Sequence, residues 1–264
     1  MRKIIDCHCH IYPEKIAAKA VESIGNFYDI SMDMDGTYSN LVAAGNAAGI
    51  THYVIFSVAT TPKQVGSINK FITDTVAAHN GFMTGLGTLH PDSPDQAADV
   101  EALIAMGLKG VKLHPDIQGV KMDDPRCIKM YELCRGRLPI LFHTGDYRYD
   151  FSNPKRVKAV LEAFPDLTVI GAHFGGWSIW ERATEELCRY DNFMVDCSSS
   201  LYSLDSNTAR DLVRRYGADR VLFGTDYPMW EPKAELERFF AMGLTEEENE
   251  LILHKNAEKL FGIE

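Results

Sequence analysis

Short apolar and β-branched runs recur along the chain at regular intervals, and this regularity constrains the fold most. Each run ends in a polar or glycine-containing turn and is followed by a helical pattern. From the third run onward, successive ends are separated by 26, 29, 30, 24 and 29 residues, close to the roughly 30 residues of one strand–helix–strand unit. The sequence predicts eight strands, at residues 3–8, 52–58, 82–88, 107–114, 138–143, 167–173, 193–197 and 220–226.

Eight such units fit a (β/α)₈ TIM barrel, an α/β fold in which residues 1–264 form a single domain. The run at 53–56 is continuously apolar, which is typical of a parallel strand covered on both faces. A doubly wound sheet is the alternative, but it would carry a glycine-rich phosphate loop after its first strand. That position holds Cys7-His8-Cys9-His10 instead, so the barrel is favoured.

Capping side chains followed by proline mark expected helix starts, because the cap satisfies free backbone N–H groups and proline lacks one. The pairs are Thr61-Pro62, Ser93-Pro94, Asp124-Pro125 and Asn153-Pro154. One unit is longer than the others because of a segment at about 12–39. Long βα loops of a barrel lie over its C-terminal face, so this loop is either a cover for the active site or a surface excursion without a role.

The charge balance excludes some partners. The 264 residues include 27 Lys and Arg against 37 Asp and Glu, a net charge of −10, which is unfavourable for a general nucleic-acid binder. No apolar run approaches the roughly 18 residues of a membrane helix, and no signal peptide is expected. The six cysteines are typical of reduced thiols, so we expect a cytoplasmic protein without a membrane partner.

Histidines close several of the predicted strands. His8 and His10 lie two apart on the first strand and therefore face the same side, while His143 and Asp226 close strands five and eight. Imidazole and carboxylate ligands at the catalytic end of a barrel predict a divalent-metal site. A single histidine of this kind is more often structural, but four ligand-type side chains are not explained that way.

The two cysteines between these histidines are predicted to point towards the helices. Side chains alternate along a strand, so Cys7 and Cys9 would face away from His8 and His10. We interpret them as small buried apolar groups rather than zinc ligands.

The sequence resembles the amidohydrolase superfamily, and within it the amidohydrolase-related branch that includes aminocarboxymuconate-semialdehyde decarboxylase. The resemblance covers nearly the whole chain. It rests on the blocks at residues 6–10, 110–115, 143–145, 172–176 and 223–228, together with the closing block at 255–260.

This resemblance implies the roles of individual residues. It makes His8, His10, His143 and Asp226 the metal ligands, with Asp226 also catalytic, and His173 a catalytic residue next to the metal. One divalent ion is expected: Zn²⁺ suits these ligands, and Mn²⁺ or Fe²⁺ would be tolerated. A second metal would need a bridging group on strand four, where only a carboxylated Lys112 would serve; an ordinary charged lysine is the expected state.

The predicted activity is hydrolysis of an amide, ester or lactone bond of a small carboxylated metabolite by a metal-activated water. Non-oxidative decarboxylation of an aromatic or dienoic acid at the same site is the alternative, and a barrel that binds without turnover is a third. Arg148, in the loop after strand five, is a candidate ligand for the substrate carboxylate. The expected partner is a small anionic molecule, and both a monomer and a homo-oligomer remain open.

Overall fold

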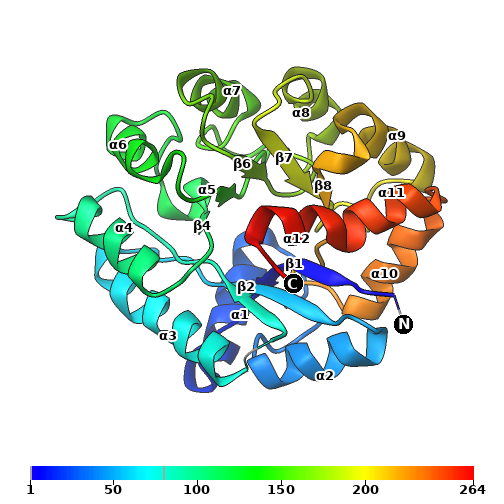
Figure 1. Cartoon of the computed structure of the whole chain (residues 1–264), viewed down its shortest axis with the longest axis horizontal. Coiled ribbons are helices and arrows are strands. Elements are labelled where there is room, and N and C mark those ends of the chain that lie inside the picture. The colour runs from blue at the N-terminus through cyan, green and yellow to red at the C-terminus, as the bar shows by residue number, and fades with distance from the viewer. Residues whose placement is uncertain (1, 80) are drawn as a thin grey trace.

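The strands of the computed structural model, which describes residues 2–79 and 81–264, form a closed ring (Figure 1). All strands run parallel in chain order, within one sheet of three and one of five. Bridges between Gly87 and Val111 and between Cys9 and Tyr227 join the two sheets. The predicted eight-stranded TIM barrel is confirmed. Its strands are β1 (Ile5–His10), β2 (His52–Phe56), β3 (Met83–Gly85), β4 (Val111–Leu113), β5 (Ile140–Phe142), β6 (Val169–Gly171), β7 (Phe193–Asp196) and β8 (Val221–Leu222).

Helices surround the ring and bury the outer faces of the strands (Figure 1). None of the helices in the described residues has the length and hydropathy needed to cross a lipid bilayer. The helices are α1 (Glu14–Tyr28), α2 (Tyr38–Ala48), α3 (Val65–Ala78), α4 (Gln96–Ala105), α5 (Pro115–Gln118), α6 (Pro125–Cys134), α7 (Pro154–Ala163), α8 (Trp180–Leu187), α9 (Ser206–Tyr216), α10 (Pro232–Ala241), α11 (Glu246–Glu250) and α12 (Asn256–Phe261).

Three of the four predicted cap–proline pairs begin helical structure. The side chains of Asp124 and Asn153 cap α6 and α7, and the pair at 61–62 opens a 3₁₀ turn that runs into α3. The prediction at 93–94 is wrong, because α4 begins at Gln96 with Asp95 as its cap. The side chain of Asp95 accepts a hydrogen bond from the backbone N–H of Ala98 in the first turn, as an N-cap residue does.

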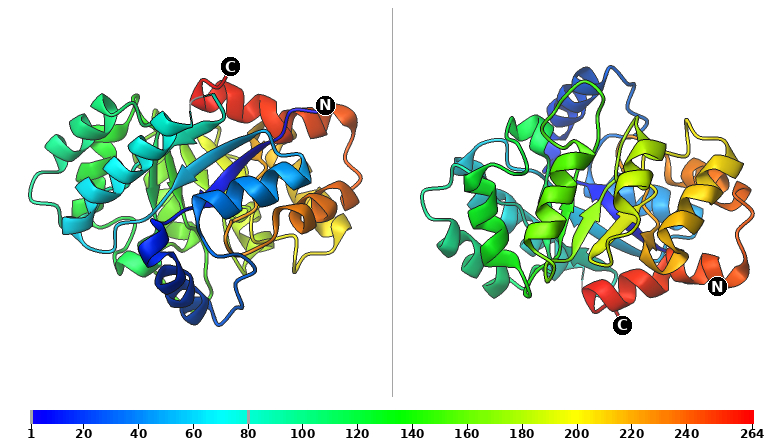
Figure 2. Two further views of the ribbon diagram at one scale, coloured as in Figure 1. Left: turned by 90° about the horizontal axis from the view of Figure 1, so that it is seen from below. Right: turned by 90° about the horizontal axis from the view of Figure 1, so that it is seen from above.

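Apolar side chains fill the barrel interior. They are Ile5, Cys7, Val54, Phe56, Leu86, Leu141, Ile170, Ala172 and Leu222. Ala257 and Phe261 of α12 pack against this cluster. Figure 2 shows that α12 lies across one end of the barrel and α1 stands at the opposite end. Because α12 covers the end where the strands begin, the mouth at their carboxyl ends lies beneath α1.

The prediction that both cysteines of β1 face the helices is correct for Cys9 only. Cys9 belongs to the outer core between strands and helices, whereas Cys7 belongs to the interior cluster. The reason is a β-bulge, since the register with β2 shifts by one residue between Asp6 and Cys9. An extra residue in a strand interrupts the alternation of its side chains. Both thiols are buried.

The segment predicted as a long loop at 12–39 contains the 15-residue helix α1. Asp29 ends this helix in a left-handed conformation with φ 54°, and α2 begins at Tyr38. Several side chains of α1 line the cavity at the mouth of the barrel. The segment therefore places a helix at the end where the strands carry their polar residues.

The buried carboxyl group of Glu235 on α10 makes the stability of the fold depend on pH. Its side chain is fully buried, pairs with Arg238, and leaves Oε2 without a partner. Burial raises the pKa of Glu235 to about 7. A carboxyl whose folded pKa exceeds its unfolded value favours folding below the unfolded pKa, and this contribution is lost as the pH rises through about 7.

We therefore expect Glu235→Gln to change stability little near pH 4.5 and to stabilise the protein by about 2 kcal/mol above pH 8. Urea unfolding at both pH values measures the difference. Glu237→Gln, at an exposed position of the same helix, is the control and should show no comparable pH dependence. Equal effects of Glu235→Gln at the two pH values would contradict the expectation.

Candidate metal centre

Strand β1 brings two imidazoles to one point at the mouth of the barrel. The Nε2 atoms of His8 and His10 lie 3.3 Å apart, and Phe56 of β2 packs edge-on against both rings. His8 is completely buried and His10 nearly so. The predicted same-side placement of the two histidines is therefore present in the structure.

Asp226 approaches these rings from the other side of the β1–β8 seam. It follows β8 in a left-handed conformation with φ 60°, and its Oδ1 lies 3.3 Å from His8 Nε2 and 3.6 Å from His10 Nε2. Its Oδ2 accepts a hydrogen bond of 2.5 Å from Ser199. Burial opposes ionisation, but His8 and His173 outweigh it and lower the pKa of Asp226. The carboxylate form that a metal ligand requires is thus favoured.

The chemistry of this donor set fits a divalent cation. The ligand atoms of His8, His10 and Asp226 all lie within 4.8 Å of one another. Burial, together with the charge of Lys112, keeps the pKa of His10 well below its ordinary value, so this imidazole is neutral at pH 7. Two imidazoles and a carboxylate are ligands that Zn²⁺ and its neighbours in the transition series accept.

His143 and His173 extend the cluster along the strand ends. His143 Nδ1 lies 3.1 Å from His173 Nε2, and His173 forms a second compact group with His8 and Asp196. Burial lowers the pKa of His173 to about 4. The structure brings all five predicted residues together, although His143 reaches His8 only through His173. The roles assigned to them stay predictions.

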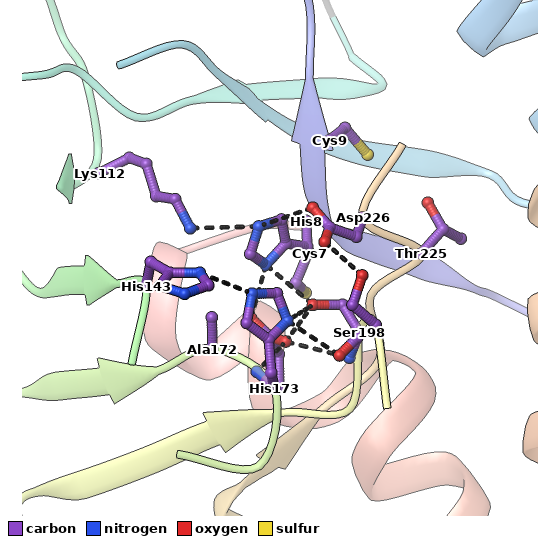
Figure 3. A network of polar contacts seen from close by, with 12 residues as sticks. Cys7, His8, Cys9, Lys112, His143, Ala172, His173, Ser198, Thr225 and Asp226 are labelled. Atoms are coloured by element: carbon purple, nitrogen blue, oxygen red, sulfur yellow. Dashed lines mark hydrogen bonds and ion pairs between the residues drawn. The ribbon is translucent and has the colours of Figure 1, made fainter. Parts of the chain in front are cut away.

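A buried carboxylate and a serine lie behind the histidines. Asp196, the last residue of β7, bonds His8 Nδ1 at 2.8 Å. Ser198 Oγ lies 3.1 Å from that atom and 3.0 Å from His173 Nδ1. Figure 3 shows Ser198 beside His8 and His173, with Lys112 reaching His8 from the opposite side. This network holds the rings from the side opposite Lys112.

The side chain of Tyr28, the last residue of α1, extends into the site from the helix that lies over the mouth of the barrel. Its hydroxyl lies 2.6 Å from His114 Nε2, and His114 stacks on His143 with ring centroids 4.1 Å apart. His114 Nδ1 accepts a bond from the backbone N–H of Ile117, so a neutral His114 carries its proton on Nε2 and donates it to Tyr28. The same hydroxyl lies 3.4 Å from His143 Nδ1, so Tyr28 contacts both stacked imidazoles.

The cluster forms one wall of a cavity of about 820 Å³. Both the strand ends and helix α1 contribute to its lining. The apolar part of the wall includes Ile16, Ile24, Phe27, Ile68 and Phe71. A cavity of this size can enclose a small organic molecule.

Asp196, Ser198, Ser199 and Tyr28 were not predicted from the sequence. Asp196 and the serines carried one usable signal, because they lie at or directly after the end of the predicted strand 193–197, just as Asp226 lies at the end of the strand 220–226. Tyr28 carried none, since nothing in the sequence shows where a helix outside the regular units will lie.

A sequence model of a family described as amidohydrolase matches residues 5–263. The chain belongs to the amidohydrolase family. The predicted resemblance is therefore confirmed, and the match spans every strand of the barrel.

Solved structures show the same fold over nearly the whole chain. An uncharacterised TIM-barrel protein from Bordetella bronchiseptica is 23% identical with a TM-score of 0.81, covering 98% of each chain. A dihydroxybenzoic acid decarboxylase from a Polaromonas species, solved with manganese and the inhibitor 2-nitroresorcinol, is 16% identical with a TM-score of 0.76, covering 99% of this chain and 97% of the other. A probable 2-pyrone-4,6-dicarboxylic acid hydrolase from Acinetobacter baumannii, with citric acid bound, is 17% identical with a TM-score of 0.70, covering 98% and 99%.

Lys112 is the buried cation of this amidohydrolase site. Its Nζ lies 3.1 Å from His8 Nε2 and 5.1 Å from the centre of the Phe56 ring. No carboxylate oxygen of the described residues forms an ion pair with it. Burial lowers the pKa of Lys112 to about 8. Its carboxylation and the presence of a second metal stay open predictions.

Arg148 is occupied by protein groups. Its guanidinium forms a bidentate salt bridge with Asp146 and donates a hydrogen bond to the backbone carbonyl of Phe27 at 2.7 Å. The described residues that line the cavity do not include it. The structure thus shows Arg148 tying the end of α1 to the loop after β5, and its contact with substrate stays a prediction.

Proposed function

We propose that this protein is a metal-dependent enzyme that hydrolyses an amide, ester or lactone bond of a small carboxylated compound. The observation that carries the proposal is the convergence of His8, His10 and Asp226 within 4.8 Å at the wall of a large cavity. Membership of the amidohydrolase family supports it.

His8, His10 and Asp226 would hold the divalent cation, with His143 completing the set. When bound, the cation supplies Lewis acidity and lowers the pKa of water towards 7. Zn²⁺ is the metal we propose. Mn²⁺ is the alternative, because the similar Polaromonas decarboxylase was solved with manganese.

Asp226 and His173 would move and orient the reacting groups. Asp226 Oδ1 accepts a proton from the attacking water, while Ser199 holds Oδ2 fixed at 2.5 Å. This is general base catalysis by a positioned carboxylate. The Nδ1–H of a neutral His173 donates to the backbone carbonyl of Ser198 at 2.9 Å, so its Nε2 would accept a hydrogen bond from the attacking water and orient it.

The cavity favours an anionic substrate with an apolar body. Lys15, Lys19 and Lys112 line it at different depths, and the rest of the wall is largely apolar. Lys112 is 1% exposed, so an anion beside it would be shielded from water. Such surroundings strengthen the attraction between opposite charges.

Decarboxylation is the second candidate, and the observation that favours it is the largely apolar wall of the cavity that Lys112 helps to line. Loss of CO₂ disperses the charge of the carboxylate, so transfer from water into an apolar site makes the reactant less favourable relative to the transition state. In this case His173 or Asp226 would return a proton to the carbon atom.

The test begins with metal analysis of protein purified without chelator, followed by a panel of carboxylated aromatics, lactones and N-acyl compounds. We expect about one equivalent of metal, and turnover that falls at least a hundredfold in His173→Ala with the metal retained. Release of CO₂ rather than a hydrolysis product would select the second candidate.

Less than a tenth of an equivalent of metal, with no binding on re-addition, would contradict both candidates. A metal-loaded protein without turnover on the panel would favour a barrel that only binds its ligand.

A further inference from the structure

Asp196 contacts two histidines of the site, although the proposed mechanism gives it no role. The residue is fully buried at the end of β7. Its Oδ2 bonds His8 Nδ1 at 2.8 Å, and its Oδ1 accepts bonds from the backbone N–H groups of His173 and Ser198 at 3.1 and 3.0 Å. Ser198 Oγ donates to the same oxygen at 2.5 Å. One carboxylate is thus shared between two histidines that come from different strands.

The contact at Oδ2 decides where His8 carries its proton. A carboxylate can only accept hydrogen bonds, so a neutral His8 must carry its proton on Nδ1. The lone pair is then on Nε2, the atom that lies 3.3 Å from both His10 Nε2 and Asp226 Oδ1. A metal ligand needs this lone pair.

The contacts at Oδ1 hold the turn that carries His173. This residue and Phe174 have φ values of 60° and 50°, which cost free energy in residues other than glycine. The N–H of His173 bonds the side chain of Asp196, and the N–H of Phe174 bonds its backbone carbonyl at 2.7 Å. These bonds to Asp196 offset the strain and fix the direction of the His173 ring.

We propose that Asp196 is the positioning residue of the candidate metal centre. It holds His8 with its proton on Nδ1 and the lone pair of Nε2 directed towards Lys112 and the proposed metal position, and it anchors the turn that carries His173. The inference rests on the proposed metal site, but the position of the proton on His8 can be measured in the metal-free protein. Partners of this kind typically change metal affinity by 10- to 100-fold.

Asp196→Asn gives the sharpest test because it changes one atom. The amide oxygen can keep the contacts of Oδ1, while the amide NH₂ replaces Oδ2 and donates to His8 Nδ1. This reverses the proton position on His8 and blocks Nε2. We expect Zn²⁺ affinity, measured by competition with a chromophoric chelator, to fall by about 10- to 100-fold.

The proton position is measured separately by ¹⁵N NMR of histidine-labelled, metal-free protein at about pH 8, with His8 assigned by its loss in His8→Gln. Wild type should show the proton on Nδ1, and Asp196→Asn should show it on Nε2. Asp191→Asn is the control, since it makes the same substitution at an exposed position just before β7, and its Zn²⁺ affinity should stay within about threefold of wild type.

A wild-type His8 with its proton on Nε2 would overturn the proposal, even if Asp196→Asn failed to fold. Unchanged Zn²⁺ affinity in a folded Asp196→Asn protein would also overturn it. If wild type bound no metal but carried the proton on Nδ1, the proposed function would fail while the positioning of His8 by Asp196 stood.

Discussion

Asp226→Asn is expected to lower kcat/KM by about 10³-fold on whichever panel compound is turned over. The amide cannot take a proton from water, and its NH₂ group can face His8 and His10 where Oδ1 now lies 3.3 and 3.6 Å away. Steady-state kinetics measured alongside metal content separates the two losses. A fall in activity at full metal occupancy would show that Asp226 acts as a base as well as a ligand.

The size of this effect is judged against two other variants. Ser199→Ala removes the hydroxyl that holds Oδ2 and should cost about tenfold, since the carboxylate remains but can rotate. Asp191→Asn changes an exposed aspartate and should leave kcat/KM unaltered. An Asp226→Asn enzyme within about fivefold of wild type would remove Asp226 from the proposed mechanism.

Gly145→Ala is expected to destabilise the fold by about 3 kcal/mol or more. Gly145 has φ 91° and lies where the loops after β5 and β6 meet, so a Cβ atom would stand 2.4 Å from the backbone nitrogen of Trp177 and 2.5 Å from the carbonyl carbon of Gly176. Backbone atoms on that side cannot move without separating the two loops. Thermal unfolding should show a decrease of about 10 °C.

Gly49→Ala is the matched control for this prediction. Gly49 has nearly the same φ, 87°, but nothing lies within 4 Å of the position of its Cβ. Its substitution should cost only the backbone strain of about 1 kcal/mol. Equal destabilisation by the two variants would mean that the contact between the loops contributes nothing.

The strand ends could be predicted because each one combines two independent signals. An apolar run such as β2 (His52–Phe56), buried along its whole length, indicates a parallel strand covered on both faces. A polar residue that closes such a run, as His143 and Asp226 do, cannot belong to the apolar core. Parallel strands then bring those residues to one end, so the candidate site followed from the strand order.

The bulge in β1 and the placement of α1 could not be predicted in the same way. The bulge depends on the register with β2, and it moved Cys7 into the interior although simple alternation put it outside. Helix α1 directs part of its apolar face into a cavity, which in a sequence is indistinguishable from packing against the core. Tyr28 and the new role of Arg148 follow from that placement and were missed with it.

The seam between β1 and β8 has a consequence for the order of folding. His8 and His10 are made near the start of the chain, whereas Asp226 is made near its end, and they meet only where Cys9 pairs with Tyr227. That pairing joins two strands from opposite ends of the chain, and because contacts between such distant residues are slow to form, we expect it to form late. A nascent chain that has not yet added β8 therefore lacks one of the proposed metal ligands, and a metal ion bound afterwards would link the first and last strands of the ring.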